Sequence, residues 1–211
     1  MSSDELVFYT HPMSRGRIVR WMLEEVGQPY RTELLDYGST MKGPEYLAVN
    51  PMGKVPALRH GDVVVTEAAA ICTYLADEFP AAKLSVPVGT PRRGLYLKWL
   101  FFGPSCVEPA MMERAYPRRE APPRAALGFG DLDTIVELLA TAAGTASPYL
   151  MGEQFTAADV VIGSGLRWGT KFGLLPERPE FIGYLERLHN RPALRRAMEK
   201  DATLQKQQER Q

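Results

Sequence analysis

Short apolar runs characterise the first third of the chain, whereas helical periodicity characterises the remainder. Apolar runs bounded by polar or turn-forming residues predict strands over Leu6–Tyr9, Tyr30–Leu35, Val55–Leu58 and Val63–Val65. Apolar residues at helical spacing predict helices over Ser14–Val26 and about Glu67–Phe79. The first three elements, a strand, a helix and a strand, indicate a right-handed parallel unit, which a hairpin and a helix then complete.

Prolines interrupt the chain between residues 80 and 91, and only helical patterns follow them. Helices are expected over Arg92–Gly103 (continuing irregularly to Tyr116), Leu132–Ala143, Thr156–Leu166, Glu180–His189 and Ala193–Lys200. Thr156 and Asp159 form a capping-box pattern at the start of one of them. We expect an α/β thioredoxin-like N-terminal domain over residues 1–82, a linker over 83–91 and an all-α helical C-terminal domain over 92–211.

Composition narrows the possible classes of function. Lys+Arg and Asp+Glu both total 25, so no global field favours nucleic acid or an anionic membrane. Cys72 and Cys106 form no metal-ligand or CxxC pattern and the histidines are scattered, so no metal site is predicted. The start MSSDELVFYT is unlike a signal peptide, and no apolar run reaches the length of a membrane span. We therefore expect a cytoplasmic protein.

The segment from Asn50 to Pro80 carries the densest functional signal. Pro56 opens a short strand, and a cis bond there would leave the Val55 N–H and C=O free to pair with an extended ligand backbone. After the hairpin, Glu67 starts a helix whose free N–H groups suit a carboxylate, while the Glu67 carboxylate could hold an ammonium group. A cleft that binds a peptide backbone, a carboxylate and an amine together has the features of a glutathione site.

This order of residues resembles the N-terminal domain of the glutathione transferase family, in a bacterial-type form with a serine-type active site. The resemblance includes FYTHPMSRGRIVRWMLEEVGQPY and the second half, so it spans nearly all 211 residues. It implies the glutathione transferase fold, with glutathione as co-substrate and no covalently bound cofactor. It also implies that Val55 and Pro56 bind the cysteinyl backbone and that Glu67 and Ala68 bind the γ-glutamyl end, although Ala68 replaces the family's serine.

Ser14 is the predicted activator of the glutathione thiol. A free thiol has a pKa of about 8.5, and lowering it by two units requires roughly 2.7 kcal/mol, which a hydroxyl donor plus a helix N-terminus can supply. Ser14 lies at the expected N-cap of the first helix and precedes Arg17 by three residues, as in serine-type branches of the family. Two alternatives remain open: Ser14 is a plain N-cap, or Tyr9 is the donor rather than a sheet aromatic.

Further candidates surround this site. Lys42 and Lys54 could bind the glycine carboxylate, although loop lysines are commonly just solvated. The electrophile pocket is expected on the helix after the linker, with help from the loop after the first strand, and about half of its aromatic and soft side chains should prove to be core. These candidates are His11, Trp99, Phe102, Cys106, Met111, Met112 and Tyr116. Cys72 is expected to be an inert, buried thiol.

Three function hypotheses follow. The first is a glutathione transferase that activates the thiolate for attack on a hydrophobic electrophile, a detoxification reaction. The second is a non-catalytic protein on the same fold that binds glutathione or a hydrophobic ligand, which the missing serine at Ala68 favours. The third is a specialised glutathione-dependent isomerase, dehalogenase or peroxidase. The resemblance implies a homodimer, and neither nucleic acid nor a membrane is an expected partner.

Overall fold

The computed structural model describes residues 5–120 and 122–209, and its contacts divide the chain into two compact units. Unit 1 comprises Met1–Ala82 and Pro192–Gln211, and unit 2 comprises Lys83–Arg191. The helical pattern predicts that residues 192–211 belong to the helical domain, whereas the contacts group the helix from Pro192 to Gln208 with unit 1, because this helix packs against the first helix of the chain. Residues 1–4, part of the segment judged unlike a signal peptide, lie outside the described residues.

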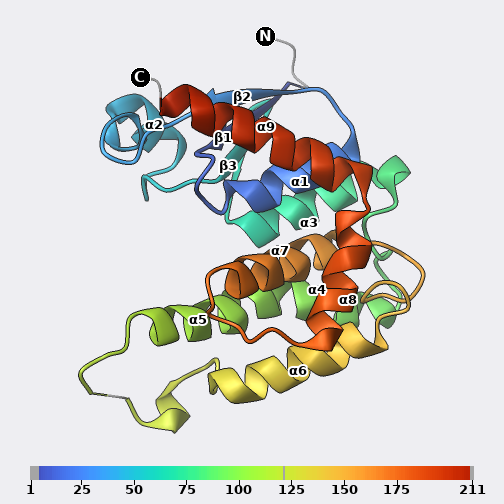
Figure 1. Cartoon of the computed structure of the whole chain (residues 1–211). Helices are drawn as coiled ribbons and strands as arrows, with labels where there is room; N and C mark the ends of the chain where they lie inside the picture. Colours follow the sequence, from blue (N-terminus) through green and yellow to red (C-terminus); the bar gives the residue numbers. More distant parts are fainter. Residues whose placement is uncertain (1–4, 121, 210–211) are drawn as a thin grey trace. The chain divides into compact units, whose positions relative to one another are not determined.

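Unit 1 is built on a mixed sheet with the strand order β2-β1-β3-β4 (Figure 1). The strands are β1 (Leu6–Thr10), β2 (Tyr30–Leu34), β3 (Ala57–His60) and β4 (Val63–Thr66). β1 runs parallel to β2 and antiparallel to β3, and β3 pairs antiparallel with β4. The hairpin between β3 and β4 turns at Gly61, whose φ of 57° suits a residue without a Cβ. The predicted thioredoxin-like sheet is confirmed.

The helices of unit 1 cover this sheet. They are α1 (Gly16–Val26), α2 (Pro44–Val49), α3 (Ala68–Glu78) and α9 (Pro192–Gln208), with short 3₁₀ turns at Thr40–Lys42 and Pro80–Ala82. α1 packs against both α3 and α9. It ends at Gly27, as predicted, where a φ of 75° lets the Gly27 amide bond the Leu23 carbonyl at 3.0 Å. A second cluster, including Leu35, Met41, Tyr46 and Ala57, packs around α2.

Charged side chains attach α9 to α1. Arg20 Nε donates to Asp201 Oδ1 at 2.6 Å, and the two side chains are 2% and 5% exposed. One turn along α1, Glu24 pairs with Arg196 at 3.1 Å and with Lys200. Burial opposes ionisation of Glu24, but hydrogen bonds from Lys200, Tyr30 and Arg196 outweigh it, so the pKa of Glu24 lies below its ordinary value. Ion pairs therefore join α9 to α1, in addition to the burial of Ala193, Leu194 and Ala197 on α9.

Unit 2 is helical throughout its described elements. They are α4 (Arg92–Phe102), a π-helical turn (Gly103–Val107), α5 (Glu108–Ala115), a 3₁₀ turn (Arg124–Ala126), α6 (Leu132–Thr145), α7 (Ala157–Lys171) and α8 (Pro179–His189). The predicted capping box opens α7: Asp159 Oδ2 accepts the Thr156 N–H at 2.9 Å. Asp159 also accepts the Tyr184 hydroxyl at 2.8 Å, which ties α8 to α7. In the described part of the chain, no helix combines the length and apolarity that a membrane crossing requires.

Candidate functional site

The register of the sheet brings the predicted glutathione residues to one end of unit 1. Tyr9, near the C-terminal end of β1, pairs with Ala57 at the start of β3, and Ala57 pairs with Thr66 at the end of β4. The segments just beyond these three strand ends hold Ser14, Val55–Pro56 and Glu67–Ala68. Because α1 and α3 both begin here, two helix N-termini add positive potential to the same end of the sheet.

The Val55 backbone is available to a ligand. The Val55–Pro56 peptide bond is cis. Among the residues that the structure describes, the Val55 N–H and C=O have no hydrogen-bond partner. The preceding residue is fixed, because Tyr46 Oη and Asn50 Nδ2 both donate to the Lys54 carbonyl, at 2.5 and 2.7 Å. An extended peptide could therefore pair with Val55 as with the edge of a sheet.

The start of α3 offers donors for a carboxylate. The first α3 amide bonded within the helix is that of Ile71, which donates to the Glu67 carbonyl at 2.9 Å. In the described chain the N–H groups of Ala68, Ala69 and Ala70 have no partner. Glu67 itself has a φ of 67°, which costs a residue with a Cβ of the order of 1–3 kcal/mol and is typical of ligand-binding positions. Its exposed carboxylate can accept an ammonium group.

Ser14 lies in the turn before α1 rather than at its N-cap. The sequence placed Ser14 at the start of the helix, but α1 begins at Gly16 and Arg15 is its N-cap. The Ser14 hydroxyl donates to the His11 carbonyl at 2.6 Å and accepts the Gly16 N–H at 2.9 Å. Its single proton would have to rotate away from His11 to reach a sulfur, which gives up one hydrogen bond of about 0.5–1.5 kcal/mol.

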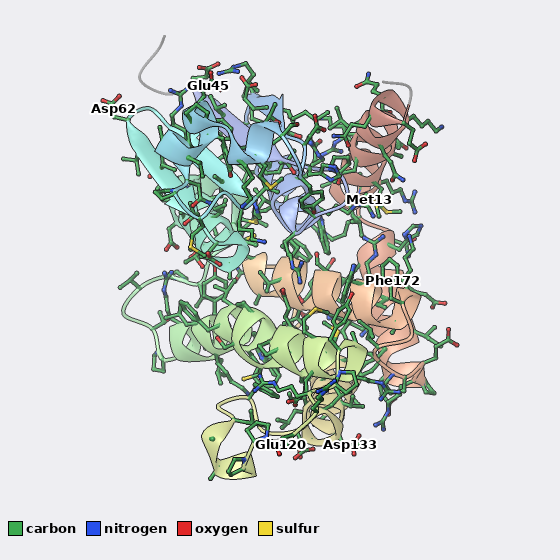
Figure 2. All side chains as sticks on the ribbon, turned by 90° about the vertical axis from the view of Figure 1, so that its left-hand side faces the viewer. Met13, Glu45, Asp62, Glu120, Asp133 and Phe172 are labelled. Atoms are coloured by element: carbon green, nitrogen blue, oxygen red, sulfur yellow. The ribbon has the colours of Figure 1, made fainter. Side chains whose placement is uncertain are left out.

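The neighbouring aromatic residues have structural partners. The Tyr9 ring packs against that of Tyr46 with centroids 5.6 Å apart, in the cluster around α2, which favours the sheet-aromatic interpretation. His11 Nδ1 accepts the Met13 N–H at 3.1 Å, and its ring lies 4.4 Å from that of Tyr37. Partial burial lowers the pKa of His11, although Asp36 opposes the shift. Met13 itself projects from this turn with 49% of its surface exposed (Figure 2).

Comparison with known proteins agrees with this geometry. The family model for the N-terminal domain of glutathione S-transferases matches residues 13–78. Glutathione S-transferase GstA of Escherichia coli O157:H7 is 30% identical over 161 residues, which cover 74% of this chain and 78% of that protein. The chain belongs to the glutathione S-transferase family.

Solved glutathione transferase structures match over almost the whole chain. The enzyme from Methylococcus capsulatus str. Bath has a TM-score of 0.79 at 30% identity, covering 94% of this chain and 99% of that one. The transferase URE2P6 from Phanerochaete chrysosporium, solved in complex with oxidized glutathione, has a TM-score of 0.79 at 28% identity, covering 95% and 98%. The predicted fold class, with a helical part following the thioredoxin-like sheet, is therefore confirmed.

The two candidate lysines differ in their surroundings. Lys42 Nζ donates to the Gly53 carbonyl at 2.7 Å and to the Met52 carbonyl at 3.4 Å, so it supports the loop before Pro56. Lys54 is exposed, and among the described residues only its backbone carbonyl has hydrogen-bond partners. Lys54 is thus the better candidate for binding a ligand carboxylate. Lys42 instead supports the loop that carries Lys54.

The candidate electrophile residues lie in unit 2, except His11. Trp99 and Phe102 pack edge to face at 5.6 Å on α4, and Lys98 Nζ lies 4.1 Å from the Trp99 ring centre. The half-buried residues of the set are Trp99, Phe102, Cys106 and Met112, with Cys106 on the π-helical turn. Burial raises the pKa of Cys106, so its thiol stays protonated near neutral pH.

Two members of the electrophile set depart from the predicted role. Met111 is 2% exposed, and a Cβ on Gly169 of α7 would lie 2.8 Å from its sulfur, so Met111 belongs to the packing between α5 and α7. Tyr116 is 78% exposed at the end of α5. Helical spacing alone could not separate these positions from the half-buried ones. Cys72 is buried, as predicted, and burial raises the pKa of its thiol far above the ordinary value.

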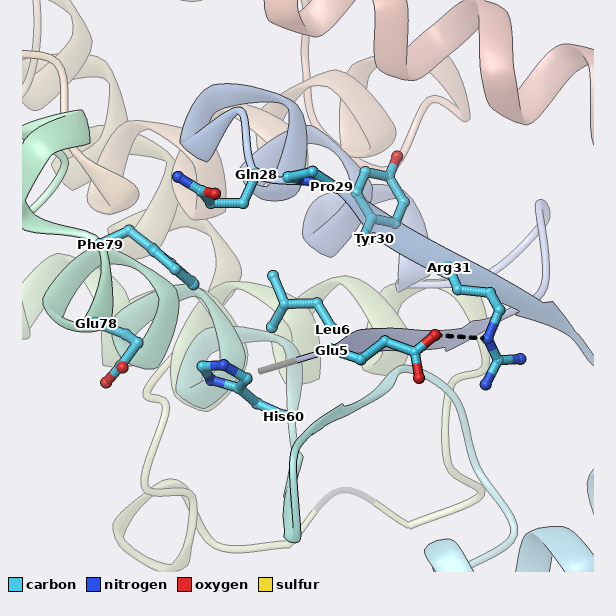
Figure 3. A pocket seen from close by; sticks show the side chains of 9 residues that line it. All are labelled: Glu5, Leu6, Gln28, Pro29, Tyr30, Arg31, His60, Glu78 and Phe79. Carbon is cyan, nitrogen blue, oxygen red and sulfur yellow. Dashed lines mark hydrogen bonds and ion pairs between the residues drawn. The ribbon is translucent and has the colours of Figure 1, made fainter. Parts of the chain in front are cut away.

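A cavity of about 620 Å³ lies at the opposite end of the sheet (Figure 3). Leu6 at the start of β1, His60 at the end of β3 and Phe79 after α3 line it. An ion pair between Glu5 and Arg31, at 3.1 Å, borders the cavity. Because β1 spans five residues, this cavity is roughly 13 Å from the Ser14 end and is separate from the candidate glutathione site.

The supporting residues of the site were not predicted from sequence. Thr10 is fully buried beneath the start of α1, and Tyr46 and Asn50 fix the Lys54 carbonyl. Burial raises the pKa of Tyr46 to about 12, which keeps its hydroxyl a donor at all ordinary pH values. A weak signal existed for Asn50, since an Asn before a proline commonly starts a turn. Nothing in the pattern distinguished Tyr46 from an ordinary core aromatic.

Proposed function

We propose that this member of the glutathione S-transferase family binds glutathione at the Ser14 end of unit 1 and lowers the pKa of its thiol for attack on a hydrophobic electrophile. The observation that supports this is the gathering of three complementary groups at one sheet end: the unpaired Val55 backbone, the start of α3 and the Ser14 hydroxyl. In this proposal the protein acts as a homodimer in a detoxification reaction, and Trp99, Phe102, Cys106 and Met112 supply the electrophile's apolar contacts.

The proposed roles follow the chemistry of the tripeptide. Val55 pairs with the cysteinyl backbone, while the α3 N–H groups hold the γ-glutamyl carboxylate and Glu67 holds its ammonium group. The thiol loses its proton to solvent, the thiolate attacks an electrophilic carbon, and any leaving group departs with the electron pair of the broken bond. Ser14 stabilises the thiolate by donating a hydrogen bond from its hydroxyl to the sulfur. The positive end of the α1 dipole stabilises the same negative charge.

The decisive experiment is titration of bound glutathione by its ultraviolet thiolate absorbance. We expect the wild-type midpoint about two pKa units below the free value of about 8.5. Ser14→Ala is expected to raise this midpoint by about 1–2 units, corresponding to about 1.4–2.7 kcal/mol of lost thiolate stabilisation, and to lower kcat/KM accordingly. Ser39→Ala, an exposed serine in the same unit, is the matched control and should titrate like wild type.

A different outcome would select the second function. If glutathione binds but its thiol titrates as in free solution, the chain is a non-catalytic glutathione-binding protein. Two observations favour that candidate: the Ser14 proton is directed at the His11 carbonyl, and Ala68 supplies no hydroxyl. A lowered midpoint with turnover restricted to isomerisation, dehalogenation or peroxide reduction in a substrate panel would instead identify the specialised enzyme.

Restoring the hydroxyl at residue 68 is expected to strengthen glutathione binding. Ala68→Ser adds one donor to the γ-glutamyl carboxylate at the start of α3, where its N–H groups already point outward. We expect a decrease in Kd of about threefold to tenfold, about 0.7–1.4 kcal/mol, by titration calorimetry. Ala70→Ser, exposed two residues further along α3, is the matched control. Equal affinities for wild type and Ala68→Ser would mean that the carboxylate binds elsewhere.

A further inference from the structure

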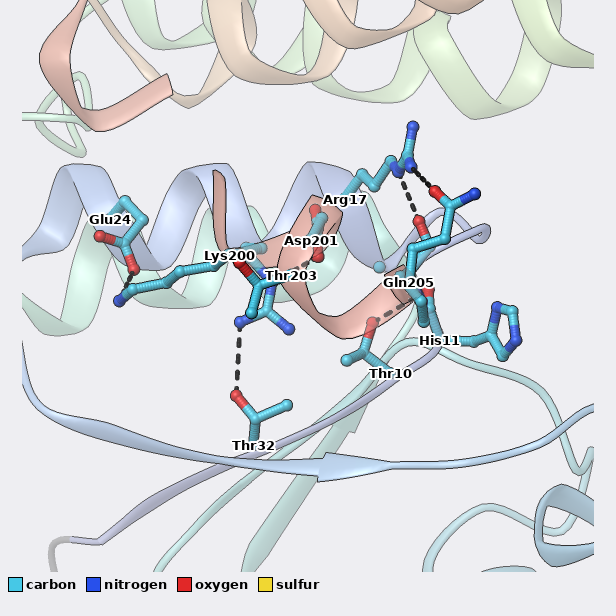
Figure 4. Close-up of polar contacts among 12 residues, drawn as sticks. Thr10, His11, Arg17, Glu24, Thr32, Lys200, Asp201, Thr203 and Gln205 are labelled. Carbon is cyan, nitrogen blue, oxygen red and sulfur yellow. Dashed lines mark hydrogen bonds and ion pairs between the residues drawn. The ribbon is translucent and has the colours of Figure 1, made fainter. Parts of the chain in front are cut away.

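The C-terminal half of α9 reaches the turn that carries Ser14. Beyond the Arg20–Asp201 ion pair, α9 carries Gln205, whose side chain lies beside that of Arg17 (Figure 4), and the helix ends at Gln208. Gln205 Oε1 accepts a hydrogen bond from the Arg17 guanidinium at 3.4 Å. Gln205 Nε2 donates to Glu209 at 3.1 Å, which leaves its oxygen directed at Arg17. A residue 188 positions further along the chain therefore contacts the first turn of α1.

Arg17 in turn holds the backbone ahead of Ser14. Its Nε donates to the Pro12 carbonyl, and its terminal nitrogen lies 3.3 Å from Met13 Sδ. Pro12 and Met13 lie between His11, whose carbonyl accepts the Ser14 hydroxyl at 2.6 Å, and Ser14 itself. Tyr37 also holds this turn, because its hydroxyl donates to the Met13 carbonyl at 3.0 Å. The orientation of Ser14 thus depends on contacts from both Arg17 and Tyr37.

A free arginine side chain would hold this turn poorly. Ordering its rotatable bonds costs side-chain entropy, and a planar guanidinium is fixed best when both ends of its fork are bonded. The Pro12 carbonyl fixes one side of the Arg17 fork and Gln205 fixes the other. One turn further along, Gln208 Nε2 donates to Asp36 at 2.7 Å, which secures this part of α9 against unit 1.

We infer that Gln205 is a positioning residue for thiol activation, acting through Arg17 on the turn of residues 11–14. The inference rests on the proposed function, since it concerns the orientation of the Ser14 hydroxyl. Gln205 touches neither glutathione nor the reacting sulfur in this account. Its role is to fix the Arg17 guanidinium from α9, so that Arg17 keeps its hydrogen bond to the Pro12 carbonyl.

The test uses the full-length protein and the thiolate titration of bound glutathione. Gln205→Met keeps the length of the side chain and removes the acceptor. We expect it to raise the midpoint by about half a pKa unit, about a threefold loss of thiolate below the midpoint, with an unchanged Tm and glutathione Kd. Gln207→Ala, an exposed glutamine on the same helix, is the control and should match wild type. In an Arg17→Met background, Gln205→Met should produce no further rise.

The possible midpoints separate failure of the Gln205 inference from failure of the proposed function. A Gln205→Met midpoint equal to that of wild type overturns the inference, as does a rise that persists undiminished in the Arg17→Met background. Either result would leave the proposed function standing, because the wild-type midpoint is measured in the same series. A wild-type midpoint equal to that of free glutathione overturns the proposed function and this inference together. A rise that is abolished by Arg17→Met supports the route from α9 to Ser14.

Discussion

Asp201→Ala is expected to lower the free energy of unfolding by about 3–5 kcal/mol, because it leaves Arg20 as a buried charge without its anion. The remaining contacts of the Arg20 guanidinium are with neutral groups, and its Cζ lies 5.0 Å from the Phe8 ring centre. Its NH1 lies 3.3 Å from both Tyr30 Oη and Thr32 Oγ1, and its NH2 is buried without a partner in the described structure. Urea unfolding followed by far-ultraviolet circular dichroism and by tryptophan fluorescence, to which the buried Trp21 of α1 contributes, measures the change.

Two further variants separate the ion pair from simple loss of a side chain. Glu199→Ala removes an exposed carboxylate from the same helix and should change the unfolding free energy by less than about 0.5 kcal/mol. The double variant Arg20→Met with Asp201→Leu replaces the pair by apolar groups and is expected to recover most of the loss. A loss below about 1 kcal/mol in Asp201→Ala would show that α9 is held mainly by other contacts.

Gly16→Ala is expected to destabilise the protein by at least about 2 kcal/mol, because the new methyl group has no space. A Cβ at Gly16 would overlap Thr10 Oγ1 and lie 3.1 Å from Thr10 Cβ and 2.9 Å from Ser14 Oγ. Thr10 is fully buried, so it cannot swing away. The start of α1 and the Ser14 turn would have to shift, and the loss of stability can be measured by urea unfolding together with the midpoint of the bound thiol.

The same substitution elsewhere provides the control for the glycine prediction. A Cβ at Gly94, near the start of α4, would meet nothing within 4 Å. Gly94→Ala is therefore expected to stabilise slightly, by about 0.5–1 kcal/mol, through helix propensity. Thr10→Ala should relieve part of the clash, so Gly16→Ala ought to cost less in that background. Additive effects of Thr10→Ala and Gly16→Ala would contradict the proposed overlap.

The sequence predicted local order far better than it predicted partners across the chain. The β3–β4 hairpin, the end of α1 at Gly27 and the capping box at Thr156 are all local features with strong residue preferences, and all are confirmed. Arg20 and Glu24, by contrast, look like an exposed pair one turn apart on α1. Their partners on α9 are more than 170 positions away, and periodicity carries no information about such pairing.

The candidate site shows the same division. The order of Pro56, the hairpin turn and Glu67 was enough to predict that the candidate glutathione residues lie close together, because sheet register then fixes their proximity. The hydrogen bond that directs the Ser14 proton could not be predicted. It forms because Ser14 and Arg15 belong to the turn between β1 and α1, whereas the helical pattern includes both residues in the helix. Met111 failed as a pocket residue for a related reason, because one helical face can serve as core or as lining.

The division of the chain into units has a consequence for synthesis. Unit 1 is discontinuous, and unit 2 is encoded between its two segments. At about 5–20 residues per second, Asp201 follows Arg20 from the ribosome by roughly 10–40 s. During that interval the nascent chain contains Arg20 and Glu24 but lacks their ion-pair partners on α9. The turn that carries Ser14 likewise lacks the contact from Gln205 through Arg17. The contacts that α9 makes with α1 can therefore form only after the whole of unit 2 has been synthesised, whatever the order in which the helices of unit 2 assemble.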